Sequence, residues 1–203
     1  THPWRGIMSV PREVGIKNTE AGYVLTQKPL SNLEALRDSV VHLRQLPAQN
    51  ISRIIDTIGL NTFELNMTFS PQDASMMGIS LRKGANQETK ILYDVQAQKL
   101  IFDRSQSGKL TENESFSAIQ EAPLPMKDGK VKLQILVDMC SVEIFANEGE
   151  LVMTNLIFPD STSNGLAFIL DDNQGFIDHF DLWQLKPAAP NAVSEHFNDD
   201  LSV

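Results

Sequence analysis

Two acidic residues on either side of a predicted tight turn are the first candidates for chemistry. Asp138 and Glu143 flank the pair Met139-Cys140. A glycosidase uses two carboxyl groups that flank the scissile bond, and acids on the two strands of a hairpin can face each other. A polar turn with one solvated acid on each strand explains the same pattern more simply. We therefore predict no catalytic residue in the chain, and an independent jelly-roll enzyme built on this pair is the third of three hypotheses.

A second acidic group surrounds a loop near the C-terminal end, and its members are Asp171, Asp172, Asp178 and Asp181. Calcium takes oxygen ligands, so a calcium site is one interpretation. The spacing does not match an EF-hand loop, and an acidic solvated turn is the commoner outcome. The histidines are scattered without zinc-binding spacing, and they are His2, His42, His179 and His196. We predict no metal and no cofactor, and a structural role for His179.

The motifs of nucleophilic and cofactor-dependent enzymes are missing from the sequence. It contains no Gly-x-Ser-x-Gly, no phosphate-binding loop and no dinucleotide-binding glycine pattern. Cys140 is the single cysteine, which excludes an intramolecular disulfide and a cysteine-based zinc site. We interpret it as a small, unreactive residue at a strand end. Asn-x-Ser/Thr sequences occur at Asn50, Asn66 and Asn113, and we draw no conclusion on glycosylation from them.

The charge of the chain limits its partners. The 203 residues carry a net charge of −9, which argues against nucleic acid because phosphate contacts need clustered Lys and Arg. No apolar run approaches the ~18 residues of a membrane span. Carbohydrate binding would use exposed aromatic side chains, and the candidates are Trp4, Tyr23, Tyr93 and Trp183. Of these, we predict that Trp183 lies in the core.

The elements that must position these residues follow from a period of two. Apolar residues alternate with polar ones along Phe63–Phe69, Val131–Val137 and Leu166–Leu170. Such alternation indicates strands with one buried face. In the first of these segments we predict that the four odd-numbered residues point into the core, that Glu64 and Thr68 point outward, and that Glu64 is exposed.

Turn residues separate the alternating segments at short intervals, as in Asp128-Gly129 and Asn164-Gly165. Many short strands between such turns indicate an all-β fold, a two-sheet antiparallel β-sandwich of the jelly-roll, concanavalin-like type. One short helix is predicted over Asn32–Arg37, with Ser31 as N-cap and Glu34 as its capping-box partner. The predicted strands are Ile7–Ile16, Tyr23–Gln27, Val40–Leu46, Arg53–Gly59, Phe63–Phe69, Met77–Arg82, Thr89–Val95, Lys99–Asp103, Ser115–Ala122, Val131–Val137, Ser141–Asn147, Leu151–Phe158, Gly165–Leu170 and Gly175–Leu185.

Four ordered segments carry a resemblance to a known family, and they are Trp4–Val14, Leu25–Leu30, Phe102–Gly108 and Val137–Asn147. The first is similar to the Trp-Arg…Pro-Arg-Glu stretch of glycoside hydrolase family 32. The others resemble that family's Gln-x-Pro connector, its Asp-Arg-Ser-x-Ser-Gly segment and its Val-Asp-Arg-Ser-Ser-Val-Glu-Val-Phe signature. The family contains levanases, inulinases, fructan β-fructosidases and invertases. The resemblance covers Pro3 to Lys186 and is greatest to the bacterial levanase type.

The resemblance implies an architecture, because in this family a β-propeller carries catalysis and a β-sandwich follows it. Residues 1–37 would be the remnant of the last propeller blade with its connector, residues 38–187 the sandwich domain and residues 188–203 a C-terminal tail. A lone two-stranded hairpin is marginal in water, so the first segment should dock on a neighbour or be mobile. We expect limited proteolysis near Pro29–Asn32 to leave a folded remainder.

The catalytic motifs of the family are absent from this sequence. The family nucleophile lies in a Trp-Met-Asn-Asp-Pro-Asn run, the transition-state stabiliser in Arg-Asp-Pro and the acid/base in Glu-Cys, and none of these occurs here. The resemblance thus implies a non-catalytic C-terminal sandwich that supports a catalytic propeller through stability and interdomain contacts. The parent enzyme would hydrolyse terminal β-fructosides.

The same resemblance implies partners and a location. The partners would be the propeller of the parent enzyme and, weakly, a fructan such as levan or inulin. The parent would be secreted or held at the cell envelope, although the sequence shows no signal peptide. A fructan-binding module is the alternative to a supporting domain.

Overall fold

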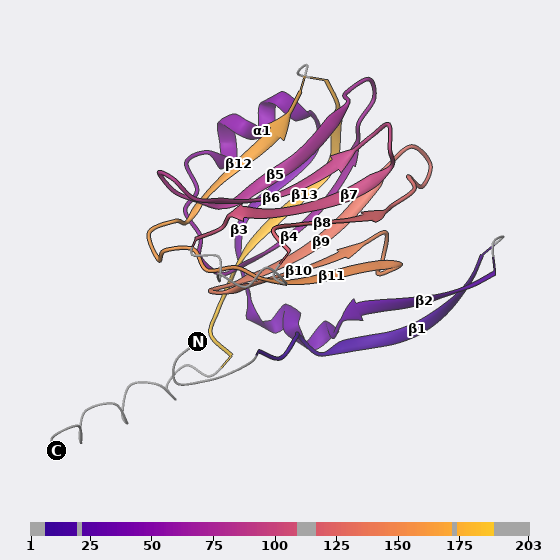
Figure 1. Cartoon of the computed structure of the whole chain (residues 1–203), viewed down its shortest axis with the longest axis horizontal. Coiled ribbons are helices and arrows are strands. Elements are labelled where there is room, and N and C mark those ends of the chain that lie inside the picture. Colours follow the sequence, from indigo (N-terminus) through magenta and orange to yellow (C-terminus); the bar gives the residue numbers. More distant parts are fainter. Residues whose placement is uncertain (1–6, 20–21, 109–116, 172–173, 189–203) are drawn as a thin grey trace, which may run out of the picture.

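Alternating apolar residues build two antiparallel sheets that pack face to face (Figure 1). The structure is a computed structural model, and it describes residues 7–19, 22–108, 117–171 and 174–188. The strands of the larger sheet are β3 (Arg37–Pro47), β4 (Phe63–Ser70), β9 (Val131–Asp138), β10 (Ser141–Ala146), β11 (Leu151–Leu156) and β13 (Phe176–Leu185). The strands of the smaller sheet are β5 (Met76–Lys83), β6 (Glu88–Asp94), β7 (Lys99–Gln106), β8 (Ile119–Pro123) and β12 (Gly165–Leu170).

The order of the strands determines which side chains become neighbours. In the described part of the chain, the six strands of the larger sheet lie in the order β11-β10-β9-β4-β13-β3, and the five strands of the smaller sheet lie in the order β12-β5-β6-β7-β8. Several neighbours are therefore far apart in the sequence, such as β4 and β13. The predicted all-β, two-sheet antiparallel sandwich is confirmed.

The core lies between the two sheets and consists of the inward residues of each strand. Along β4, Phe63, Leu65, Met67 and Phe69 are each at most 1% exposed, as the alternation predicts. The inward residues of β5 in the other sheet are equally buried, and they are Met77, Ile79 and Leu81. Burying a side chain of this size stabilises the fold by about 1.5–3 kcal/mol, so the two inner faces hold the sheets together.

A separate two-stranded sheet precedes the sandwich and is formed by β1 (Arg12–Thr19) and β2 (Gly22–Pro29). The amide of Gln27 donates to the carbonyl oxygen of Gly149, in the β10–β11 turn, at 3.0 Å. Gly149 permits this approach, because its φ is +84° and a Cβ there would lie 2.0 Å from the Gln27 carbonyl oxygen. From this contact the hairpin extends away from the sandwich (Figure 1).

One predicted strand is wrong. The segment Arg53–Gly59 is not a strand but the end of helix α1 (Ala48–Ile55) and the turn that follows it. The buried residues of the helix are Ala48, Ile51 and Ile55, whose spacing of three and then four places them on one helix face. The isoleucines favour a strand by propensity, but packing of this face against the sandwich decides for the helix.

The connector between the hairpin and the sandwich is a 3-10 helix, η1 (Ser31–Leu36), which begins and ends one residue earlier than predicted. The predicted cap at Ser31 is wrong, because Leu30 precedes the helix and no side chain caps it. Glu34 does not complete a capping box but lies 3.3 Å from the Arg37 guanidinium. The connector therefore delivers Arg37 to the start of β3.

The remaining predicted strands differ from the observed ones mainly at their ends. β1 begins at Arg12 rather than at Ile7, and β3 begins at Arg37 rather than at Val40. The predicted strand Ser115–Ala122 corresponds to β8, and residues 115 and 116 lie outside the described residues. Pairing with neighbouring strands sets these ends, and alternation within one strand does not report that pairing.

Candidate functional site

The face of the six-stranded sheet that points away from the core is polar, and the hairpin lies beside it (Figure 1). Glu64, Asn66 and Thr68 of β4 point outward because the residues between them point into the core. On the neighbouring strands, Gln134 of β9 and Asp181 of β13 lie opposite Asn66. We call this surface, with these five residues at its centre, the outer face.

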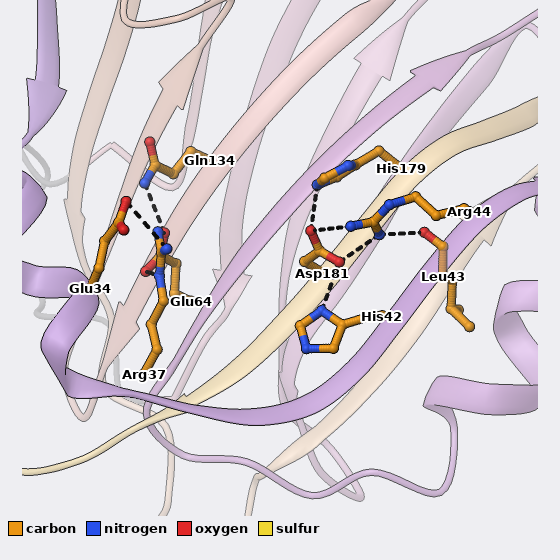
Figure 2. Close-up of polar contacts among 9 residues, drawn as sticks. All are labelled: Glu34, Arg37, His42, Leu43, Arg44, Glu64, Gln134, His179 and Asp181. Atoms are coloured by element: carbon orange, nitrogen blue, oxygen red, sulfur yellow. Dashed lines mark hydrogen bonds and ion pairs between the residues drawn. The ribbon is translucent and has the colours of Figure 1, made fainter.

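Glu64 is 1% exposed, so its predicted exposure to solvent is wrong. It points away from the core, but Arg37 donates to its two carboxylate oxygens at 2.6 and 2.8 Å and Gln134 donates at 2.8 Å (Figure 2). These hydrogen bonds to Glu64 raise the pKa of Arg37. The Arg37 guanidinium also lies over the ring of Trp183, 4.4 Å from its centroid. Arg37, at the start of β3, thus covers an outward position that alternation assigns to water.

Asp181 is 5% exposed and has three nitrogen-bearing partners (Figure 2). Arg44 donates to both of its oxygens at 2.5 and 2.9 Å, and ring nitrogens of His42 and His179 each lie 2.7 Å from one oxygen. Burial alone would raise the pKa of Asp181, but the hydrogen bonds from Arg44 and His42 outweigh it and hold this pKa below its ordinary value. For His179, burial lowers the pKa more than the Asp181 charge raises it. The cluster fixes β3 to β13 through an ionised carboxylate.

A buried ion pair ties the hairpin to the sandwich. The Glu143 side chain, 5% exposed, accepts hydrogen bonds from the Arg12 guanidinium and from the Val10 amide, both at 2.6 Å. Arg12 also donates to Gln27 at 3.0 Å and to Thr154 at 2.6 Å. We call these five residues the latch. It joins β1, β2, β10 and β11 and holds the hairpin in one position against the sheet.

The predicted pair of acids does not form a catalytic site. Asp138 is exposed and accepts a hydrogen bond from the Met139 amide at 2.7 Å, while Glu143 is held by Arg12. Cys140 is half-buried, and burial raises the pKa of its thiol, as for an unreactive cysteine. The geometry therefore gives no support to an independent enzyme built on these acids.

The acidic residues predicted to surround one loop have different partners in the structure. Asp178 pairs with Lys130 at 2.6 Å, and Asp171 accepts a backbone amide hydrogen bond at 3.1 Å. Asp181 belongs to the cluster with Arg44, and Asp172 lies outside the described residues. No group of three or more His, Cys, Asp or Glu side chains that could hold a metal occurs within the described ranges. The geometry does not support the calcium interpretation.

The other candidate residues from the sequence analysis, the aromatic side chains and the asparagines, lie in separate parts of the molecule. Tyr93 lies in the core and donates to a backbone carbonyl at 2.9 Å, whereas Tyr23 is 80% exposed on the hairpin. Trp183 is half-buried on the outer face opposite Glu64, so its predicted place in the core is wrong. Asn50 is exposed on α1. The candidates that lie outside the described part of the chain are His2, Trp4, Asn113 and His196.

A groove of about 270 Å³ opens on the outer face where the hairpin meets the sheet. Asn66, Thr68 and Gln134 line it from the sheet, Lys28 from β2 and Glu148 from the β10–β11 turn. A second cavity of about 500 Å³, lined mostly by aliphatic side chains, lies where the segment before β1 meets η1 and the end of β13.

Sequence reasoning missed the residues that organise the outer face, and they are Arg12, Arg37, Arg44 and Gln134. A signal was present in the runs of outward polar residues on several strands. Those runs predict solvated strand faces when each strand is considered alone. Only the strand order and the path of the connector bring the polar residues together and cover them.

Comparison with known protein families identifies this sandwich. Residues 32–184 match the family model described as the C-terminal region of glycosyl hydrolases family 32. The chain belongs to this family. The levanase of Bacillus subtilis strain 168 is 40% identical to it over 170 residues, which are 82% of this chain and 25% of the levanase. The extracellular exo-inulinase of Aspergillus awamori is 33% identical over 166 residues, which are 79% of this chain and 31% of the inulinase.

Solved structures of family 32 enzymes share the fold. The exo-inulinase from Aspergillus awamori aligns with a TM-score of 0.79 at 28% identity, over 92% of this chain and 37% of that chain. The fructofuranosidase from Schwanniomyces occidentalis aligns with a TM-score of 0.73 at 18% identity, over 92% of this chain and 42% of that chain, and shows the fold alone. This family 32 chain thus spans less than half the length of these relatives. Within its described residues, no helix has the length and apolar character needed to cross a membrane.

Proposed function

We propose that this chain serves as the non-catalytic C-terminal β-sandwich of a longer, levanase-like enzyme that hydrolyses terminal β-fructosides. Its family and its similarity to a levanase and an exo-inulinase support this role. The absence of the family's catalytic motifs from the sequence supports a non-catalytic role for this part of the enzyme. The proposal includes the division into residues 1–37, which complete a catalytic propeller, residues 38–187, which form the sandwich, and a tail of residues 188–203.

The observation that carries this proposal is the exposed apolar face of the hairpin. Val14, Ile16, Leu25 and Tyr23 are 67%, 74%, 55% and 80% exposed. Ile16 lies opposite Leu25, and Val14 and Tyr23 lie two residues away along β1 and β2, so all four share one face. Contiguous exposed apolar side chains mark an interaction surface. The latch fixes the hairpin to the sandwich, and we propose that a catalytic domain covers this face.

The test joins this chain to the catalytic region of the Bacillus subtilis levanase, in place of the segment that it matches. We expect Ile16→Asp to lower the temperature at which levan hydrolysis is lost, because it places a charge in an apolar contact. Ile119→Asp is the matched control, since Ile119 is 55% exposed on β8 of the other sheet. Equal effects of the two changes, or no effect of Ile16→Asp, would contradict the proposed docking.

We also propose that the protein acts outside the cell, because the similar Aspergillus awamori enzyme is named an extracellular exo-inulinase. The protein should then be found in the culture medium of its source organism rather than in washed cells. Weak binding of a fructan is a second proposed role, favoured by the polar groove on the outer face.

A further inference from the structure

The groove beside the hairpin contains a buried polar atom that the fold leaves without a partner. The Oδ1 atom of Asn66 is buried and has no hydrogen-bond partner among the described residues. Gln134 uses its amide nitrogen to donate to Glu64, and its amide oxygen is turned away from that contact (Figure 2). Because an unpaired buried acceptor costs about 1–3 kcal/mol, a ligand whose donor reaches the Asn66 amide would remove this cost.

The arrangement of donors and acceptors defines the kind of occupant. Asn66 lies opposite Gln134 on β9, and Thr68 lies opposite His179 on β13, so four polar side chains from three strands border the same groove. Two amide groups, one hydroxyl and one imidazole can each donate or accept hydrogen bonds. Such a set matches a ligand with several adjacent hydroxyl groups.

The charged side chains that border the groove pair with one another. Glu148 lies between two lysines, 3.0 Å from the Lys132 ammonium and 3.9 Å from that of Lys28. His179 lies 2.7 Å from the Asp181 carboxylate. The polar side chains that β4 and β9 contribute to the centre of the groove are neutral, and they are Asn66, Thr68 and Gln134. They match a neutral ligand with hydroxyl groups.

We propose that this groove binds one sugar residue of a neutral fructan chain, with the side chains of Asn66, Gln134, Thr68 and His179 forming hydrogen bonds to its hydroxyl groups. The volume of about 270 Å³ suits a single sugar ring. The choice of a fructan rests on the proposed function, whereas the choice of a neutral sugar rests on the groove alone. A shallow site with few contacts binds weakly, with a Kd on the order of 1–10 mM.

The experiment titrates the full chain, labelled with nitrogen-15, with a fructo-oligosaccharide and follows its amide resonances by NMR. We expect saturable shifts at the side-chain amides of Asn66 and Gln134 and at the backbone amides of Thr68 and His179. Asn66→Ala should weaken binding about 3- to 10-fold, which corresponds to the loss of one hydrogen bond. Thr68→Val, which keeps the shape of the side chain, should weaken it to a similar degree.

Two controls make the experiment decisive. Asn32→Ala removes an exposed amide of η1 and should leave the affinity unchanged. A malto-oligosaccharide and glycerol separate a fructan from another sugar and from any polyol. Equal binding of all three ligands, shifts located elsewhere or wild-type affinity in both groove variants would overturn the proposal. If Asn66→Ala does not fold, Thr68→Val decides the outcome.

This experiment is independent of the docking test. Ile16 does not line the groove, so Ile16→Asp probes the supporting role without touching the sugar contacts. If docking fails while the groove variants lose fructan binding, the groove proposal stands and the supporting role falls. If docking holds while no fructan binds, the supporting role stands and the groove proposal falls.

Discussion

Glu64 and Glu121 show how strongly the environment of a single glutamate depends on what covers it. Both occupy outward positions of strands, yet the Glu64 side chain is 2% exposed and that of Glu121 is 53% exposed. Glu121 pairs with Lys99 at 2.8 Å in water, where an ion pair contributes about 0–1 kcal/mol. Burial removes the Glu64 carboxylate from water, which costs free energy. The ion pair with Arg37 compensates for this lost hydration.

We expect Arg37→Ala to lower the free energy of unfolding by about 3 kcal/mol, since it removes one partner of a buried ion pair. Lys99→Ala breaks the exposed pair and should lower it by less than about 1 kcal/mol. Urea unfolding of both variants measures the difference. Similar values for the two would mean that water already reaches Glu64.

The Asp181 cluster gives the protein a pH dependence whose sign follows from its pKa shifts. The pKa of His179 is lowered from 6.5 in the folded chain, mainly by burial. As the pH falls below that value, the unfolded chain takes up a proton that the folded chain resists, so stability is lost. The pKa of Asp181 is also lowered, so its contribution is lost only below about pH 4.

We therefore expect the melting temperature of the wild-type chain to fall between about pH 7 and pH 5, and to fall less in His179→Gln. Glutamine can still donate to Asp181 but does not titrate. The measurement is a melting curve at each pH in constant ionic strength. Identical slopes for the two proteins would show that His179 does not contribute to the pH dependence.

At the scale of elements, the hairpin and the connector contribute differently to the sandwich. The hairpin reaches the sandwich through the latch, whose Arg12–Glu143 ion pair is largely buried between them. The connector η1 instead leads into β3 and brings Arg37 over Glu64. The predicted boundary between residues 37 and 38 therefore falls immediately after a residue that the sandwich uses.

We expect a chain that begins at Ser31 to fold with a melting temperature close to that of the full chain, because it keeps Arg37. A chain that begins at Asp38 should be less stable by about 3 kcal/mol, because it lacks the Arg37 partner of the buried Glu64 carboxylate. Introducing Arg37→Ala into the longer of the two chains should reproduce this loss. An unfolded chain beginning at Ser31 would show instead that the hairpin is part of the core structure.

At the scale of the whole molecule, Arg82 of β5 connects the ends of the two sheets. It is 0% exposed, and it donates to the carbonyl oxygens of Asn61, Met139, Asp160 and Ser163 at 2.7–3.3 Å. Met139 lies in the β9–β10 turn of the larger sheet, whereas Asp160 and Ser163 precede β12 of the smaller one. One guanidinium thus satisfies four carbonyl oxygens from three loops.

We expect Arg82→Met to lower the free energy of unfolding by about 3 kcal/mol, because it leaves the buried Ser163 carbonyl and three partly buried carbonyl groups without their donor. Arg53→Met, at an exposed position of α1, is the matched control and should change stability by less than about 0.5 kcal/mol. Urea unfolding again provides the measurement. Equal stability of the two variants would indicate that water replaces the guanidinium.

The whole chain by itself should release no fructose from levan, inulin or sucrose above background. Retaining hydrolysis needs a nucleophile and an acid/base held on opposite sides of the bond, and the two candidate acids are engaged elsewhere. A reducing-sugar assay checks this, with Glu143→Gln as the comparison. Turnover that disappears in Glu143→Gln would restore the hypothesis of an independent enzyme.

The sequence by itself determined the class of fold and the core. Alternation is a local property, because successive side chains of a strand point to opposite faces. It therefore predicted that Phe63, Leu65, Met67 and Phe69 are buried, and the structure confirms this. Ordered motifs in the sequence also indicated the family to which the chain belongs. The prediction of a strand over Arg53–Gly59 failed because a short apolar segment is compatible with a strand and with a helix.

Only the tertiary structure decided which outward residues are covered and which meet. Arg12 and Glu143 are 131 positions apart, and His42 and Asp181 are 139 apart, so no local pattern relates them. The strand order places Asn66 between Gln134 and Asp181, and Arg37 covers Glu64. Burial of a polar side chain depends on segments that arrive from elsewhere in the chain. For that reason the latch, the Asp181 cluster and the groove became visible only in the folded molecule.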